Sequence, residues 1–172
     1  MVVAVSGGFD PLHKGHIRYL EDAKKLSGKD GTLIVILNGD SFLIRKKGYV
    51  FFNVEERQEI VSALRCVDEV YIYESEKDDV CEALIEINPD IFAKGGDRRP
   101  DGDPIPEEEL CGQLGIKVVY GVGGNDKPNS SSWVVDNVWK QIEKKNTIKN
   151  AGPVDNDNYI SGYYDVLLNE DK

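Results

Sequence analysis

The chain has 172 residues, a length that suits one domain with room for a substantial core. Hydrophobic residues make up 40% and charged residues 30%, which is typical of soluble globular proteins and not of disordered chains. The formal net charge of −10 argues against nucleic acid or an anionic membrane as the main partner.

The sequence also indicates the cellular compartment and the state of the cysteines. No apolar stretch approaches the roughly 20 residues that a membrane-spanning helix needs, and the N-terminus lacks a signal-like segment. We therefore expect a cytoplasmic protein. Cys66, Cys81 and Cys111 are odd in number and widely spaced, which indicates buried or partly buried thiols and not a disulfide framework or a zinc knuckle.

Strand-like and helical patterns alternate along the chain. In order, they predict strand 2–6, helix 14–26, strand 32–37, helix 54–65, strand 67–73, helix 78–87, strand 90–93, strand 117–120 and helix 131–144. Such alternation favours an α/β fold, an open parallel sheet with helices on both faces. Asn53, followed three residues later by Glu56, predicts the N-cap of the second helix.

The pattern also suggests a division of the chain into residues 1–145, a single domain, and residues 146–172, a linker and tail. The linker is rich in Asn, Asp, Gly and Pro, as turns and flexible segments are. The tail carries apolar and aromatic residues, so it either docks on a subunit or remains a mobile end. The last predicted helix carries apolar residues at helical spacing, which predicts a core-facing stripe of Val134, Val135, Val138 and Ile142.

Residues 5–16 carry the sharpest signal. An apolar strand ends in Gly7 and Gly8, and His13 and His16 follow at the start of a helix. Free backbone N–H groups and the helix dipole favour phosphate at such a helix start. Glycines allow a close approach of backbone and ligand, and two imidazoles about one turn apart can both donate to phosphate oxygens. The stretch therefore predicts a site for phosphate chemistry.

The segment from Gly7 to His16, Gly-Gly-Phe-Asp-Pro-Leu-His-Lys-Gly-His, resembles the Gly-x-Phe-Asp-x-x-His-x-Gly-His signature of the cytidylyltransferase-like nucleotidyltransferases. That family transfers a nucleotidyl group from a nucleoside triphosphate to a phosphate monoester or a related acceptor and releases pyrophosphate. The resemblance covers about residues 1–145 and implies a Rossmann-like fold with the triphosphate at the His-x-Gly-His helix start. It implies catalytic roles for His13 and His16, substrate binding by Asp10, and nucleotide binding by Gly7, Gly8, Phe9 and Gly15. Gly8 departs from many relatives, which carry a side chain there.

Two cationic segments extend the resemblance. Arg45, Lys46 and Lys47 fall in the loop where related enzymes have a lysine that reaches the phosphates. We expect Lys46 to be this catalytic lysine, with Lys47 as its rival and a solvated charge run as the alternative. Arg57 lies in the first turn of a helix, where the dipole disfavours a cation. It either binds a substrate phosphate or forms a structural salt bridge with Glu55 or Glu56.

Two further segments are expected at the nucleotide. Lys94-Gly95-Gly96-Asp97 follows a strand and is similar to the adenylyltransferase part of ADP-heptose synthases. This similarity implies nucleotide binding by these four residues, with Lys94 meeting either the acceptor phosphate or the triphosphate. Ser130, Ser131 and Ser132 open the last helix, where hydroxyls and free N–H groups bind anions or cap the helix.

Together these features predict a nucleotidyltransferase that moves CMP or AMP to a small phosphate monoester. The compact layout resembles glycerol-3-phosphate cytidylyltransferase and favours CTP slightly, whereas Lys-Gly-Gly-Asp favours ATP and a sugar phosphate. A non-catalytic nucleotide-binding regulator is the alternative of another class, and a thiol- or metal-dependent enzyme is disfavoured by the residue spacing. We expect Mg²⁺ to accompany the triphosphate without a protein carboxylate cage. By analogy with relatives, we expect a homodimer.

Overall fold

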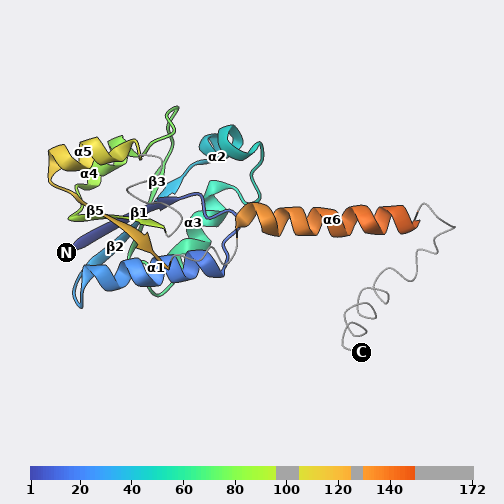
Figure 1. The fold of residues 1–172 in the computed structure, drawn as a ribbon, viewed down its shortest axis with the longest axis horizontal. Coiled ribbons are helices and arrows are strands. Elements are labelled where there is room, and N and C mark those ends of the chain that lie inside the picture. The colour runs from blue at the N-terminus through green and yellow to red at the C-terminus, as the bar shows by residue number, and fades with distance from the viewer. Residues whose placement is uncertain (96–104, 125–129, 150–172) are drawn as a thin grey trace. The chain divides into compact units, whose positions relative to one another are not determined.

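A computed structural model of the chain describes residues 1–95, 105–124 and 130–149, with side chains as far as residue 145. The described strands are β1 (Val2–Gly7), β2 (Thr32–Asn38), β3 (Glu69–Tyr73), β4 (Ile91–Gly95) and β5 (Lys117–Val122). They form one parallel sheet in the order β3-β2-β1-β4-β5 (Figure 1). The expected open parallel sheet of a Rossmann-like α/β fold is confirmed.

The described helices are α1 (Lys14–Ser27), α2 (Asp40–Lys47), α3 (Val54–Ser62), α4 (Cys81–Ile87), α5 (Glu107–Leu114) and α6 (Ser131–Lys149). The expected N-cap of α3 is confirmed, because Asn53 accepts from the Glu56 backbone N–H and the Glu56 side chain accepts in return. Helices α2 and α5 were not predicted.

The loop predicted for Arg45, Lys46 and Lys47 is wrong, since these residues form the last turn of α2. The start of α2 depends on a residue distant in sequence. Its N-cap, Gly39, has no side chain to accept the first backbone N–H groups. Instead Glu74, which follows β3, accepts from the Asp40 backbone N–H and the Ser41 hydroxyl. A cap supplied from another strand leaves no local sequence signal.

The two faces of the sheet bury alternate residues of each strand. On one face, Val3 and Val5 of β1 pack in a core with residues of α1 and α3. On the other face, Ala4 packs in a second core with residues of α4 and α5. Figure 1 shows α1 and α3 on one side of the sheet and α4 and α5 on the other. Burial on both faces explains why the central strands are nearly continuous apolar runs.

The chain reverses its direction of travel across the sheet at β1. From β1 it proceeds outward to β2 and β3, and then returns to place β4 on the other side of β1. Open α/β sheets bind their ligands at such a switch point, beyond the carboxyl ends of the strands. Here those ends are Gly7 of β1 and Gly95 of β4.

The chain divides into two units, Met1–Val134 and Val135–Lys172. The first holds the sheet, α1 to α5 and the first residues of α6. Of the second, the structure describes the remainder of α6, so the boundary that we expected after residue 145 falls within this helix. The expected core-facing stripe of α6 is wrong for Val138 and Ile142, which are 48% and 44% exposed. Among the described helices, none is long and apolar enough to span a membrane.

Candidate functional site

A cavity of about 470 Å³ opens at the carboxyl edge of the sheet, a size typical of sites for small molecules. It is lined by the end of β1, the start of α1, the last turn of α2, the end of β4, the start of α5, the end of β5 and the start of α6. Most of the residues predicted for the site line this cavity: Gly7, Gly8, His13, Gly15, His16, Lys46, Lys94, Gly95, Ser130, Ser131 and Ser132. Phe9, Asp10 and Arg57 do not line it, and Gly96 and Asp97 lie outside the described residues.

The two histidines form a capping box at the start of α1. His13 is the N-cap, and its Nδ1 accepts from the Gly15 backbone N–H at 3.1 Å. Nδ1 of His16 accepts from the His13 backbone N–H at 3.3 Å. The rings stack, with their centroids 3.8 Å apart. A neutral imidazole whose Nδ1 accepts must carry its proton on Nε2, so each ring can donate from Nε2.

His16 is held in its neutral form. Burial, followed by the charges of His13 and Lys47, lowers the pKa of His16 from 6.5 to about 3. The Phe9 ring meets the His16 ring edge-on at 5.0 Å and contributes to its apolar surroundings. At neutral pH the His16 side chain is therefore a hydrogen-bond donor and not a cation.

The glycine turn before α1 is tightly packed. A Cβ on Gly8 would lie 2.5 Å from Cδ2 of Leu43 in α2, and a Cβ on Gly7 would lie 3.0 Å from the Phe9 ring. Leu43 of α2 therefore occupies the space that a side chain at position 8 would need.

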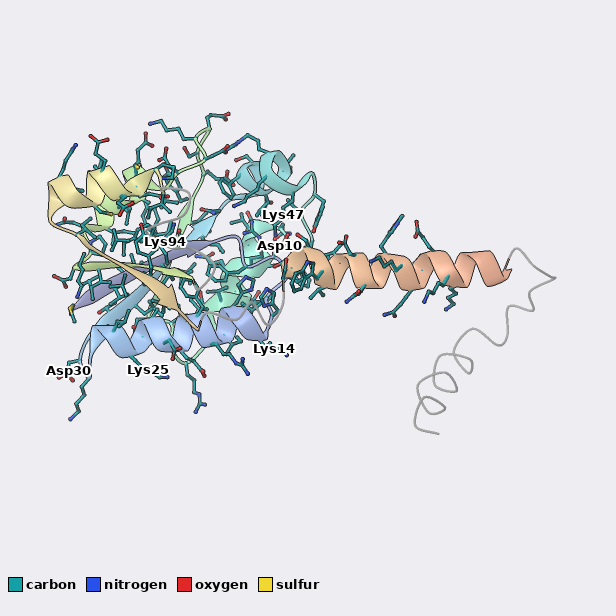
Figure 2. All side chains as sticks on the ribbon, in the orientation of Figure 1. Asp10, Lys14, Lys25, Asp30, Lys47 and Lys94 are labelled. Atoms are coloured by element: carbon teal, nitrogen blue, oxygen red, sulfur yellow. The ribbon has the colours of Figure 1, made fainter. Side chains whose placement is uncertain are left out.

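Two lysines of α2 face the cavity in different ways. The Lys47 ammonium donates to the backbone carbonyl of Asp10 at 3.0 Å, and burial is the main cause that lowers its pKa. Figure 2 shows Lys47 beside Asp10. Lys46 is exposed, with its ammonium 5.3 Å from the centre of the Phe42 ring. Lys46 is thus the lysine whose side chain is better able to move toward a ligand.

Asp10 and Arg57 lie beneath the cavity instead of lining it. Asp10 is fully buried, and its carboxylate accepts from the backbone N–H groups of Phe51 and Phe52, both at 2.8 Å. Arg57 is 1% exposed and donates to the backbone carbonyls of Gly8, Asn38 and Phe52 and to the Asp40 carboxylate. Of the two roles left open for Arg57, these contacts favour the structural salt bridge, but the partner is Asp40 and not the expected Glu55 or Glu56.

Two residues that sequence reasoning missed contact β4 at the cavity, Tyr19 from α1 and Glu107 from α5. The Tyr19 hydroxyl donates to the Ala93 carbonyl at 2.6 Å and so fixes α1 against β4. Tyr19 follows His16 by three residues on α1, a spacing that could have indicated it. Glu107 lies 3.8 Å from the Lys94 ammonium, oxygen to nitrogen. It belongs to a run of three Glu residues that reads as a solvated helix start, so no local signal marks it.

The start of α6 contributes polar groups to the same cavity. The Ser131 hydroxyl is buried and donates to the Pro11 carbonyl at 3.1 Å, which fastens the start of α6 to the loop before α1. Ser130 and Ser132 also line the cavity. The starts of α1 and α6 thus direct two sets of helix N-terminal N–H groups toward one space, where anions are favoured.

The described residues offer the cavity more phosphate donors than metal ligands. Within the described ranges, no group of three His, Cys, Asp or Glu side chains could hold a metal ion. The described part of the cavity instead gathers two imidazole donors, the ammonium groups of Lys46, Lys47 and Lys94, and serine hydroxyls. Such a set suits a polyphosphate, which carries its own ligands for Mg²⁺.

Residues 4–119 match the family described as Cytidylyltransferase-like. The chain belongs to this family. The expected relationship to cytidylyltransferase-like nucleotidyltransferases is therefore confirmed, and with it the enzyme class.

Individual relatives refine this relationship. The chain is 41% identical over 99 residues to the FAD synthase of Methanobrevibacter smithii, a match that covers 58% of this chain and 64% of the relative. It is 37% identical over 133 residues to the bifunctional protein HldE of Pelobacter propionicus, covering 74% of this chain and 26% of the relative. The crystal structure of the lipopolysaccharide core biosynthesis protein from Thermoplasma volcanium is 32% identical, with a TM-score of 0.56, covering 73% of this chain and 98% of that chain.

Proposed function

We propose that the protein transfers AMP from ATP to a phosphate monoester and releases pyrophosphate, with FMN as the first acceptor to test and FAD as its product. The main support is the stacked pair of histidines at the start of α1, whose Nδ1 atoms are both occupied by backbone N–H groups. This arrangement directs two N–H donors at the position where a helix start favours phosphate.

The reaction needs no protein nucleophile. A phosphate oxygen of the acceptor attacks the α-phosphorus of the triphosphate, and the bond from that phosphorus to the oxygen bridging toward the β-phosphate breaks. The electron pair of the broken bond leaves with pyrophosphate. Catalysis then rests on holding the two substrates in line and on stabilising the charge that develops on the phosphoryl oxygens.

Most of the predicted residues that line the cavity have a role in this scheme. His13 and His16 donate from Nε2 to oxygens of the α-phosphate and its neighbour. Lys46 moves toward the leaving pyrophosphate, and Ser130 to Ser132 bind its far end with the helix N–H groups of α6. Lys94 holds a phosphate oxygen at the β4 wall. Gly7, Gly8 and Gly15 allow the close approach of the ligand to the backbone.

The choice of ATP is supported by the relatives and by one sequence segment. The chain is similar to proteins named FAD synthase, and FAD contains an adenylyl group joined to FMN. The Lys-Gly-Gly-Asp segment resembles adenylyltransferases as well. The slight preference for CTP rested on compact layout alone, and the relatives reported above give it no support. A sugar phosphate, suggested by the same segment, is the second candidate acceptor.

Three further properties belong to this proposal. Mg²⁺ binds with the triphosphate, neutralises part of its charge, and needs few protein ligands. The protein is a homodimer by analogy with its relatives, which a light-scattering mass at micromolar concentration tests; a monomer mass contradicts it. It works in the cytoplasm, in keeping with its free thiols Cys66, Cys81 and Cys111.

The test is a matrix of substrates. The protein is incubated with Mg²⁺ and either ATP or CTP, each with FMN, glycerol 3-phosphate or an aldose 1-phosphate. Pyrophosphate is assayed and the products are identified by mass. We expect pyrophosphate and FAD from ATP with FMN. Turnover of ATP with the aldose phosphate alone supports the second acceptor, and turnover with CTP alone contradicts the choice of nucleotide. No pyrophosphate from any pair contradicts the proposal.

A further inference from the structure

Glu107 lines the cavity and yet is only 4% exposed. It is the first residue of α5, and the next two, Glu108 and Glu109, are exposed. The favourable interaction of acidic residues with the helix dipole accounts for a run of three Glu in a first turn. It does not account for burial of the first of them, because a carboxylate that leaves water is destabilised unless a partner compensates it.

The two oxygens of Glu107 have different surroundings. Oε1 accepts from the backbone N–H of Val80, the N-cap residue of α4, at 3.2 Å. Oε2 is buried and accepts no hydrogen bond from the described part of the chain. Lys94 faces this oxygen, with its ammonium nitrogen 3.8 Å away. That separation is too long for a hydrogen bond but within the range of a strong charge interaction.

The simplest structural role for Glu107 is to attach α5 to α4 through the hydrogen bond from Val80 to Oε1. This role does not explain why the second oxygen, Oε2, is buried beside Lys94. An uncharged glutamine would also accept from the Val80 N–H, without bringing a charge into the core. The carboxylate adds a negative charge beside Lys94. The inward placement of that charge, at the wall of the cavity, calls for a reason beyond capping.

Lys94 is held by its surroundings more closely than lysines usually are. Its side chain is 13% exposed, and its ammonium lies 4.5 Å from the centre of the Phe92 ring in addition to its contact with Glu107. A free lysine side chain has many rotamers, and fixing it costs their entropy. Where the fold has already restricted the side chain, less of that entropy remains to be lost when a substrate binds.

The geometry points to Glu107 as a positioning residue for Lys94, whose ammonium it holds at the carboxyl end of β4 to meet a substrate phosphate. Because the two groups attract each other without a hydrogen bond between them, Lys94 can take a phosphate oxygen without breaking one to Glu107. This inference deepens the proposed function and rests on it, since it requires a phosphate ligand in the cavity.

A double-mutant cycle tests the inference. The variants are Lys94→Met, Glu107→Gln and their combination, with Glu109→Gln as a control that removes an exposed carboxylate from the same helical turn. Glutamine keeps an oxygen for the Val80 N–H. For each protein, the Kd of ATP with Mg²⁺ is measured by calorimetry, and kcat and KM for FMN by pyrophosphate release. Thermal unfolding reports on the fold.

We expect Lys94→Met to raise the Kd of ATP, raise the KM for FMN or lower kcat, according to which phosphate Lys94 meets. Glu107→Gln should change the same quantity in the same direction by about tenfold, as coupled residues do. In the Lys94→Met background, Glu107→Gln should change that parameter less than about twofold. Glu109→Gln should match the wild type. If Glu107→Gln does not fold, the same cycle is run with Glu107→Asp, which keeps the charge but withdraws it from Lys94.

Equal fold-changes in both backgrounds would overturn the inference, because Glu107 would then act through the fold and not through Lys94. Unchanged parameters in the wild-type background would overturn it as well. Binding is measured without turnover, so the two proposals can fail separately. A wild type that binds ATP but shows an additive cycle refutes only the role of Glu107. A wild type that neither binds a nucleotide nor releases pyrophosphate refutes the proposed function and this inference with it.

Discussion

Residues of one sequence signature have opposite surroundings in this molecule. His13 and His16 line the cavity, whereas Asp10, from the same signature, is fully buried beneath it together with Arg57. Each histidine accepts from a backbone N–H through Nδ1, so its proton lies on Nε2, which is a donor. Arg57 directs Nε, Nη1 and Nη2 to acceptors of the protein itself. The direction of the hydrogen bonds thus separates residues that meet a ligand from residues that hold the site in shape.

This difference predicts different losses. Removal of a supporting residue should reduce the free energy of unfolding, and activity should fall only because the fold fails. Removal of a cavity-facing donor should reduce turnover while the fold persists. Three substitutions and one change of pH test this difference.

Arg57→Met should cost the most stability. It leaves three backbone carbonyls and the Asp40 carboxylate without their donor, a change that typically destabilises by about 3 kcal/mol or more. Urea unfolding measures the loss, and Arg65→Met, on an exposed residue, should stay within about 0.5 kcal/mol of the wild type. A stable Arg57→Met protein with impaired substrate binding would instead favour the ligand contact.

His16→Asn should reduce turnover by about 10²-fold, the scale for loss of one preorganised donor. The Asn side-chain oxygen can replace Nδ1 as acceptor for the His13 backbone N–H, but no group replaces Nε2. His16→Gln reverses this arrangement, since its amide reaches toward the position of Nε2. We expect Gln to retain more activity than Asn in pyrophosphate-release assays. Equal activity in both variants, near that of the wild type, would contradict the role of Nε2.

Lys46→Met should lower kcat by about tenfold, equivalent to about 1.4 kcal/mol, with little change in stability because the side chain is exposed. Lys47→Met is the comparison, since it removes the bond to the Asp10 carbonyl and should lower the melting temperature. Steady-state kinetics and thermal unfolding of both variants separate the two lysines. A greater loss of kcat in a stably folded Lys47→Met protein would exchange their roles.

Because His16 is held neutral, the free energy of unfolding should fall as the pH falls. Unfolded His16 binds a proton below about pH 6.5, and folded His16 does so only below about pH 3. Between these values the unfolded state binds more protons. The stabilisation is therefore fully present above about pH 6.5 and is lost as pH falls toward 3. Each such group contributes at most about 1.4 kcal/mol per pH unit.

Urea unfolding of the wild type and His16→Asn between pH 7 and pH 5 measures this contribution as a difference in slope. The carboxylates titrate in both proteins, so their effect cancels. The wild type should lose stability faster than the variant as pH falls. Parallel slopes would show that His16 is not held neutral.

The parts of the fold and site that local patterns encode were predictable. The strand runs and α1 follow from apolar periodicity, and the cap of α3 follows from Asn53 and Glu56 three residues apart. The histidine pair, Lys94 and the serines line the cavity, and each lies at a strand end or a helix start of a recognisable signature, whereas Lys46 lines it from the last turn of α2. These are the positions that a parallel sheet brings to one edge.

The remaining parts depend on contacts between distant residues. Helix α2 is capped by Glu74, which follows β3, and the sequence of α2 has little amphipathic pattern. The role of Arg57 depends on the carbonyls of Gly8 and Asn38, which only the fold places around it. Glu107 is like Glu108 and Glu109 in sequence and differs from them in its burial and in its contacts with Val80 and Lys94. No local pattern distinguishes such residues.

The most direct test of the account is calorimetric titration of the wild type and His16→Asn with ATP, CTP, GTP and UTP, each with Mg²⁺ and with FMN present or absent. The account predicts that the wild type binds ATP more tightly than the other three, and that His16→Asn, though folded, binds it at least about tenfold more weakly. A wild type that binds none of the four in either condition, or a His16→Asn protein that binds ATP as the wild type does, would contradict the assignment of this cavity as the nucleotide site.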